Sequence, residues 1–240
     1  MPRVTIPGPR GPLPGYAEQP SGPGPWPGVV VLHDAGGMTS AITTQVEWLA
    51  GAGFLTVAPD LFSYGSTMRC LVSVMRETMR GSGRCFDDID AARAWLADHD
   101  GCTGRVGVLG FCMGGGFALM LAPHGRYDAA SVNYGPLPKD AEQVLRTSCP
   151  IVGSFGAKDP TLRGTAARLD RILTEAGVPH DVMEYPDAGH SFMEEIAWRE
   201  IPLPLAVAGK LSGSRFHGPS MRDARARIEA FLATHLAEPD

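Results

Sequence analysis

From Gly28 onward, short apolar segments alternate with amphipathic segments of helical period, and this alternation constrains the fold more than any other feature of the chain. Several apolar segments are apolar on both faces, which is typical of strands in a parallel sheet that helices cover on both sides. Repeated β–α alternation predicts an α/β protein with a mostly parallel, doubly wound sheet. We predict strands at residues 29–32, 54–58, 105–109, 129–132, 151–155 and 181–185, and helices at residues 40–50, 87–99, 114–121 and 162–176.

The two ends of the chain have features of their own. Residues 1–27 are rich in proline and glycine, and they allow only short edge strands near residues 4–6 and 13–17, because proline cannot donate a hydrogen bond within a sheet. Near the other end, Ser220 and Asp223 match an S-x-x-D capping pattern and predict the start of a final helix. We find no repeat and no linker-like tract, so we predict a single domain over residues 1–240.

The composition excludes several classes of protein. A net charge of −5 and a pI near 5.8 argue against a nucleic-acid partner, because Lys and Arg supply most of the affinity for phosphate. The apolar runs, such as residues 29–32, are far shorter than the roughly 18 residues that a membrane span requires. The seven histidines lack H-x-x-x-H spacing, and we expect neither a metal nor a cofactor. The five cysteines form no C-x-x-C pair and the start of the chain lacks a secretory signal, so we expect reduced thiols and a cytoplasmic location.

The most informative stretch is G-V-L-G-F-C-M-G-G-G at residues 107–116. A β-branched run leads into G-x-C-x-G and then into an apolar helix, which is the context of a nucleophile elbow with Cys112 at its tip. Each glycine in the first turn of a helix costs about 1 kcal/mol relative to alanine, so a close approach of backbones must outweigh that cost. The positive end of the helix dipole favours a thiolate here. One alternative is that Cys112 is a small buried hydrophobic residue, and a weaker one is that the glycines form a dinucleotide fingerprint.

Two later loops supply a candidate acid and a candidate base. Asp159 follows the predicted strand at 151–155, and His190 follows the predicted strand at 181–185. Both residues therefore lie at the carboxyl ends of strands, where open α/β sheets form their sites. The order of nucleophile, acid and base is that of the α/β hydrolases. Asp187 competes for the role of the acid, although its short separation from His190 suits a turn better.

The first core strand ends in H-D-A-G-G, followed by Thr39 or Ser40 as a helix cap. At this position an α/β hydrolase supplies one amide of the oxyanion hole, and the residue after the nucleophile supplies the other. By position these amides belong to Ala35 and Met113. Asp34 has a structural alternative, because an aspartate here can form an Asx turn at the entry to the glycine loop.

These motifs resemble those of the dienelactone hydrolase family of α/β hydrolases, from the first core strand to the C-terminal helix. They include H-D-A-G-G, A-P-D-L-F at residues 58–62, G-F-C-M-G-G, the loop with Asp159, and A-G-H-S-F. The resemblance implies that Cys112 is the nucleophile, that His190 is the general acid and base, and that Asp159 orients the imidazole. It also implies a role for Asp34 in switching the thiol to thiolate, although the family has a glutamate there, which is one methylene longer.

The resemblance also bears on the substrate. Members of the family bind a carboxylate-bearing lactone with two arginines, and this chain has Glu194 where one of them stands. An acid at that position would repel such a substrate unless another arginine compensates. Residues 195–217 look longer than the corresponding loop of the family, and we expect a lid or pocket loop there. We further expect Tyr64, Phe192 and Trp198 to line the pocket, and the candidate compensating arginines are Arg69, Arg76, Arg80, Arg84 and Arg199.

These features together predict a hydrolase that cleaves a small-molecule carboxylic ester or lactone through a Cys–His–Asp triad and an acyl-enzyme intermediate. Two alternatives stay open. The first is a non-catalytic binding protein that retains this fold, since a fold does not determine a function. The second is a thioesterase or a redox-active thiol enzyme. The natural ester and the oligomeric state are not predicted.

Overall fold

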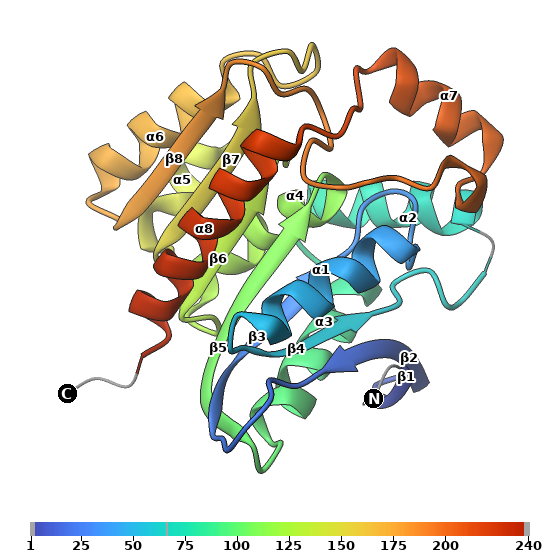
Figure 1. The fold of residues 1–240 in the computed structure, drawn as a ribbon, viewed down its shortest axis with the longest axis vertical. Helices are drawn as coiled ribbons and strands as arrows, with labels where there is room; N and C mark the ends of the chain where they lie inside the picture. The colour runs from blue at the N-terminus through green and yellow to red at the C-terminus, as the bar shows by residue number, and fades with distance from the viewer. Residues whose placement is uncertain (1–2, 66, 238–240) are drawn as a thin grey trace.

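The computed structural model describes residues 3–65 and 67–237 of the chain. Its centre is a sheet of eight strands, and their order across the sheet is β1-β2-β4-β3-β5-β6-β7-β8 (Figure 1). The six strands β4, β3, β5, β6, β7 and β8 are parallel to one another. At one edge, β2 pairs antiparallel with both β4 and β1. This arrangement confirms the predicted mostly parallel α/β sheet. The strands are β1 (Arg3–Gly8), β2 (Gly11–Glu18), β3 (Trp26–Leu32), β4 (Leu55–Pro59), β5 (Cys102–Phe111), β6 (Ala129–Asn133), β7 (Ile151–Gly156) and β8 (His180–Tyr185).

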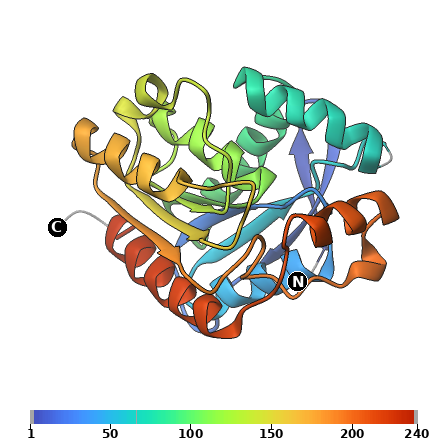
Figure 2. The ribbon, with the colours of Figure 1, turned by 90° about the horizontal axis from the view of Figure 1, so that it is seen from above.

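Helices lie on both faces of the sheet. The helices are α1 (Ser40–Gly51), α2 (Thr67–Arg80), α3 (Arg84–Ala97), α4 (Met113–Leu121), α5 (Ala141–Val144), α6 (Thr165–Ala176), α7 (Leu203–Leu211) and α8 (Gly218–His235). Figure 2 shows α1 and α8 on one face and α3, α4 and α6 on the other. Within the described ranges, each helix is too short or too polar to cross a membrane.

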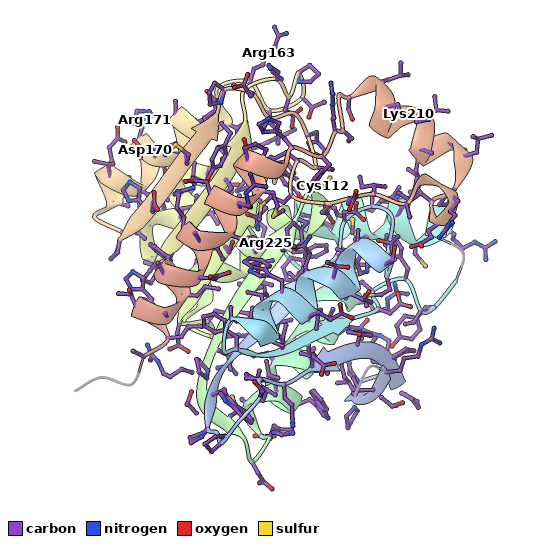
Figure 3. All side chains as sticks on the ribbon, in the orientation of Figure 1. Cys112, Arg163, Asp170, Arg171, Lys210 and Arg225 are labelled. Atoms are coloured by element: carbon purple, nitrogen blue, oxygen red, sulfur yellow. The ribbon has the colours of Figure 1, made fainter. Side chains whose placement is uncertain are left out.

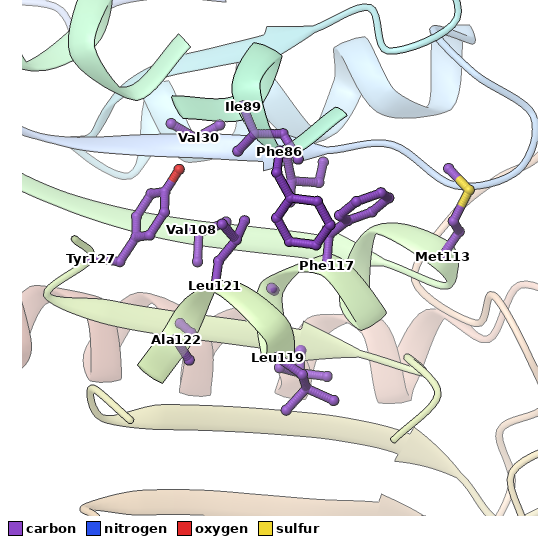
Figure 4. Close-up of a cluster of buried hydrophobic side chains, with 14 of the residues drawn as sticks. Val30, Phe86, Ile89, Val108, Met113, Phe117, Leu119, Leu121, Ala122 and Tyr127 are labelled. Atoms are coloured by element: carbon purple, nitrogen blue, oxygen red, sulfur yellow. The ribbon is translucent and has the colours of Figure 1, made fainter. Parts of the chain in front are cut away.

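The alternation of side chains along the central strands separates two clusters of buried hydrophobic residues. Val30 and Leu32 of β3 belong to the cluster on the side of α3 and α4, whereas Val29 belongs to the cluster on the side of α1 and α8. In the first cluster Phe86 and Phe117 pack edge to face, with ring centroids 5.0 Å apart (Figure 4). Burial on both faces explains why the central strands read as continuous apolar runs.

Three of the predicted helix starts differ from the structure by two or three residues, and the first is that of α3, which begins at Arg84 and not at residue 87. Helix α8 begins at Gly218 with His217 at the N-cap position, and the hydroxyl of Ser220 is instead hydrogen-bonded to Nδ1 of His217 at 2.8 Å. Pro219 suits the first turn of this helix, where a backbone N–H has no partner to lose. Helix α6 begins after Gly164, whose φ of 73° breaks the helical path that we extended from residue 162.

Helices α2 and α7 were not predicted. In α2 the buried residues Cys70, Leu71 and Val74 follow a helical spacing among charged neighbours. In α7 the helical signal is weak, because the apolar residues do not form one stripe, Gly209 is a poor helix former, and only Ala206 is buried. Helix α2 packs against α4, and the omission of both helices leaves the predicted sheet unchanged.

Candidate active site

Cys112 lies in the tight turn where β5 meets α4, near the middle of the molecule (Figure 3). Its backbone has a φ of 52°, and its N–H donates to the carbonyl oxygen of Asn133 at 2.9 Å. A Cβ atom at Gly110 would lie 2.0 Å from the carbonyl oxygen of Gly114, and a Cβ atom at Gly114 would lie 2.2 Å from that of Leu32. Strand, turn and helix are therefore in backbone contact, which is the demand that outweighs the poor helix propensity of these glycines.

His190 and Asp159 meet at the carboxyl ends of neighbouring strands. Nδ1 of His190 lies 2.5 Å from Oδ2 of Asp159. Thr161 donates its N–H at 2.8 Å and its hydroxyl at 2.6 Å to the other oxygen of Asp159, which is buried. The competing acid, Asp187, is exposed and pairs with Lys158 at 2.9 Å. The structure therefore pairs His190 with Asp159 and not with Asp187.

His190 and Asp159 each shift the pKa of the other toward its charged form. Burial lowers the pKa of His190, but hydrogen bonds with Asp159 and Cys112, together with their charges, outweigh it and raise the pKa to about 10. Burial raises the pKa of Asp159, but the hydrogen bonds from His190 and Thr161 outweigh it and hold this pKa below its ordinary value. His190 therefore interacts with both Asp159 and Cys112.

The loop after β3 lies beside the nucleophile turn, because the first turn of α4 touches the end of β3. Oδ1 of Asp34 accepts the N–H of Gly36 at 2.7 Å, so the Asx turn is present. Burial raises the pKa of Asp34, and the charge of His190 acts in the opposite direction, so this carboxyl group also lies within reach of the triad. Ala35 is half-buried in the same loop, and Met113 is the first residue of α4, where the helix leaves the backbone N–H unpaired.

Tyr134 is a residue of the site that the sequence analysis missed. It follows β6, has a φ of 43°, and is fully covered. Its ring centroid lies 5.3 Å from that of His190, and its hydroxyl donates to Oε2 of Glu194 at 2.8 Å. Burial and the charge of Glu194 raise the pKa of Tyr134 well above its ordinary value, so the hydroxyl remains a donor. The only signal in the sequence was its position directly after the carboxyl end of a central strand.

Glu194 does not act as an exposed acid that repels a ligand. Its side chain is covered, with 1 % of the residue exposed. Burial, and next the charge of Asp34, raise the pKa of Glu194 well above its ordinary value, which favours the neutral acid. The expectation of direct repulsion at this position is therefore replaced by a buried carboxyl group that contacts Tyr134.

The predicted pocket residues have different positions. Phe192 is completely buried and packs on Tyr134 with centroids 5.6 Å apart, so it belongs to the core and not to a pocket wall. The guanidinium carbon of Arg84 lies over the ring of Tyr64, 4.3 Å from the ring centroid, and Tyr64 contacts no described residue of the candidate triad. The side chain of Trp198 lies outside the described part of the structure. The other arginines considered are exposed, and in residues 3–65 and 67–237 none of them pairs with a triad residue: Arg69, Arg76, Arg80 and Arg199.

The segment 195–217 lies against the loop with Asp34. Both carboxylate oxygens of Glu200 accept hydrogen bonds from Ser40, one from its N–H at 2.8 Å and one from its hydroxyl at 3.0 Å. Glu200 therefore caps α1, and the predicted capping by the side chain of Thr39 or Ser40 is absent. Cδ1 of Ile201 would lie 3.4 Å from a Cβ atom at Gly36, so the segment covers this end of the loop.

Comparisons with known proteins identify sequences similar to this chain. A model of the dienelactone hydrolase family matches residues 13–202. The carboxymethylenebutenolidase of Pseudomonas putida is 27% identical over 181 residues, which are 70% of this chain and 75% of that protein. A carboxymethylenebutenolidase of a Pseudomonas species is 29% identical over 176 residues, which are 69% of this chain and 74% of that protein.

Solved structures show a similar likeness in fold. A dienelactone hydrolase-like promiscuous phosphotriesterase from metagenomic libraries has a TM-score of 0.77, with 22% identity and 97% of both chains covered. The acylaminoacyl peptidase of Pyrococcus horikoshii has a TM-score of 0.73 and 13% identity, with 100% of this chain and 42% of that one covered. These structures confirm the predicted α/β-hydrolase fold.

Proposed function

This chain belongs to the dienelactone hydrolase family, and from that premise we propose that it hydrolyses a small-molecule carboxylic ester or lactone by covalent catalysis at Cys112. The observation that carries the proposal is the line of contacts from buried Asp159 through His190 to the cysteine at the tip of the turn. The chemistry needs a nucleophile, a base within reach of it and a group that orients the base, and these three residues are of the required types.

In the first half-reaction, the thiolate of Cys112 attacks the carbonyl carbon and forms a C–S bond, while the carbonyl π electrons move to oxygen. The backbone N–H groups of Ala35 and Met113 stabilise this oxyanion. When the tetrahedral intermediate collapses, the C–O bond to the alcohol breaks, and protonated His190 donates its proton to the leaving oxygen. Asp159 stabilises the imidazolium before the transfer and keeps the ring oriented after it.

In the second half-reaction, neutral His190 takes a proton from water, and the oxygen of that water attacks the thioester carbon. Collapse of the second tetrahedral intermediate breaks the C–S bond and returns the electron pair to sulfur. The acid product leaves, and the imidazolium–thiolate pair is restored. In a lactone the alcohol and the acid are parts of one molecule, so a single product departs.

The surroundings of the triad suggest further parts of the proposal. Asp34 helps to set the charge state of the thiol, because its carboxyl group interacts with His190. The segment 195–217 serves as a pocket loop, and its support is the pair of hydrogen bonds from Ser40 to Glu200 beside the loop with Ala35. The five free cysteines suit a cytoplasmic location.

The replacement of Cys112 by Ala tests the proposal. We expect C112A to lower kcat/KM for a p-nitrophenyl ester by at least about 10⁴-fold, because removal of a nucleophile abolishes the covalent route. The matched control is C102A, which removes a half-buried free thiol at the opposite end of β5. If C112A hydrolysed the ester as fast as C102A, covalent catalysis at this residue would be excluded.

A further inference from the structure

The hydrogen bond between Tyr134 and Glu194 joins the end of β6, which lies beside the turn of Cys112, to the loop that carries His190. Tyr134 directly follows Asn133, whose carbonyl oxygen accepts the N–H of Cys112 at 2.9 Å. Glu194 lies in the loop that carries His190, and its own N–H donates to the carbonyl oxygen of Ser191 at 3.2 Å. The contact of 2.8 Å between the Tyr134 hydroxyl and Oε2 of Glu194 therefore connects the two sides of the triad directly.

Both partners depend on this bond because both are buried. Tyr134 is 0 % exposed and Glu194 is 1 % exposed, so water does not replace a lost partner at either side chain. The second carboxyl oxygen of Glu194, Oε1, is buried without a hydrogen bond to any described residue. The Tyr134 ring also packs against His190, with centroids 5.3 Å apart. A shift of Tyr134 would therefore move the surface on which the imidazole lies.

The outer side of the His190 loop is held by a separate set of contacts. Nε2 of Gln45 in α1 donates to the carbonyl oxygen of Met193 at 3.1 Å, and Oε1 of Gln45 accepts from Arg225 in α8 at 2.9 Å. The positions of Arg225 and Cys112 can be followed in Figure 3. These contacts attach the loop to α1 and α8, whereas the Tyr134 hydroxyl attaches it to the strand ends beside the nucleophile.

We infer that Tyr134 and Glu194 are positioning residues, and that their hydrogen bond sets the separation between the Cys112 sulfur and the His190 imidazole. The inference rests on the function proposed above, since it assigns these residues to the same reaction. Neither side chain touches the reacting atoms in this scheme, and both act through His190. A misplacement of a catalytic group by about 1 Å can cost about 10²-fold in rate, so one buried hydrogen bond is sufficient for a large effect.

The experiment compares the variants Y134F, E194A, E194Q and the double variant Y134F/E194A. We expect Y134F and E194A each to lower kcat for a p-nitrophenyl ester by roughly 10- to 100-fold with little change in KM, because the catalytic geometry is altered and the pocket is not. E194Q retains kcat, because the amide oxygen still accepts the Tyr134 hydroxyl. The double variant is no slower than the slower single variant, because both changes remove the same bond.

The matched control is Y127F. Tyr127 is also buried, at 3 % exposed, and its hydroxyl has no hydrogen-bond partner among the described residues. It belongs to the cluster on the side of α3 and α4, away from the triad (Figure 4). Y127F therefore removes a buried hydroxyl without a contact to His190, and we expect its kcat to equal that of the wild type.

A second measurement separates positioning from general stability. The rate at which iodoacetamide alkylates Cys112 is followed against pH, because alkylation reports the thiolate. In Y134F we expect the midpoint of this profile to move to higher pH, since a displaced imidazolium stabilises the thiolate less. In E194Q and Y127F we expect the wild-type profile.

Three outcomes would overturn the inference: a wild-type kcat and alkylation profile in Y134F, a loss in Y127F equal to that in Y134F, or a loss in E194Q as large as that in E194A. The C112A variant distinguishes this failure from failure of the proposed function. If C112A is inactive while Y134F behaves as the wild type, only the proposed positioning role of Tyr134 and Glu194 is disproved. If C112A remains active, the proposed mechanism itself is wrong.

Discussion

Three residues other than glycine have positive φ values in the described backbone, and all three border the candidate site. They are Cys112 at 52°, Tyr134 at 43° and Ser191 at 54°. Such conformations cost of order 1–3 kcal/mol each and persist only where the surroundings enforce them. Cys112 follows β5, Tyr134 follows β6, and Ser191 follows His190 in the loop after β8. The backbone strain is therefore concentrated around the candidate site.

Asp159 is the residue whose charge most directly supports the imidazolium. We expect D159N to lower kcat by about 10³- to 10⁴-fold, because the amide neither stabilises the imidazolium nor holds the reactive tautomer. The matched control is D187N, since Asp187 is exposed and pairs only with Lys158 among the described residues. A kcat for D159N near that of D187N would contradict this role.

The same pair makes the stability of the fold depend on pH. The pKa of His190 is raised from its ordinary value of 6.5 to about 10 in the folded state. Its stabilising contribution is therefore fully present below pH 6.5 and is lost as the pH rises toward about 10. We expect the difference in the free energy of unfolding between the wild type and D159N, measured in urea, to be largest just below pH 6.5 and to shrink above it. A difference that grew with pH would show that the sign is wrong.

At the scale of secondary structure, the turn from β5 into α4 determines where Cys112 lies. Gly114 lies against the backbone of β3, where a Cβ atom would approach the Leu32 carbonyl oxygen to 2.2 Å. At Gly116, in the same helix, a Cβ atom would lie 3.3 Å from Cγ2 of Thr78, a tight contact with a side chain that a shift of a few tenths of an ångström relieves. The two glycines therefore have different reasons for being there, although the sequence presents them as one run.

We expect G114A and G116A to have opposite effects on stability. G114A forces α4 away from β3 and lowers the free energy of unfolding by about 1–3 kcal/mol or more, as overpacking does in other cores. G116A leaves the fold as stable as the wild type or stabilises it by up to about 1 kcal/mol, because alanine is the better helix former. Urea denaturation of both variants measures the difference. Equal destabilisation would show that the close approach at Gly114 is not the reason for its glycine.

At the scale of the whole molecule, acidic side chains outnumber Lys and Arg by five. The net charge is −5, and the acids near the triad are Asp34, Asp159 and Glu194. Among the described side chains, no Lys or Arg forms an ion pair with any of these three acids. A substrate that carries a carboxylate would therefore bring a negative charge close to Asp159 and Asp34, and His190, the positive charge beside them, is already paired with Asp159.

We expect kcat/KM to be at least about tenfold higher for uncharged aryl esters and lactones than for a carboxylate-bearing dienelactone. A panel that includes cis- and trans-dienelactone, an uncharged lactone and a p-nitrophenyl ester measures this difference. Rapid turnover of either dienelactone would show that a Lys or Arg of the protein binds the substrate carboxylate.

Much of this architecture was predictable from local patterns. The central strands were predicted to within a few residues, because apolar runs bounded by turns indicate strands buried on both faces. The candidate triad was predictable for a related reason: Cys112, Asp159 and His190 each follow a predicted strand, and the carboxyl ends of parallel strands meet at one edge. Helix α7 was missed because its apolar residues do not form one stripe of helical period, and only Ala206 is buried.

By itself, the order of residues determined the alternating strands and helices, the glycines of the nucleophile turn and the three residues at the carboxyl ends of strands, since each depends on neighbours along the chain. Only the tertiary structure decided that Asp159 and not Asp187 holds His190, that Phe192 is core, and that Glu194 is a covered partner of Tyr134. The physical reason is that burial and hydrogen-bond partners are set by packing between distant segments, and the same carboxyl group is a charged ligand site in water and a neutral hydrogen-bond acceptor when it is covered.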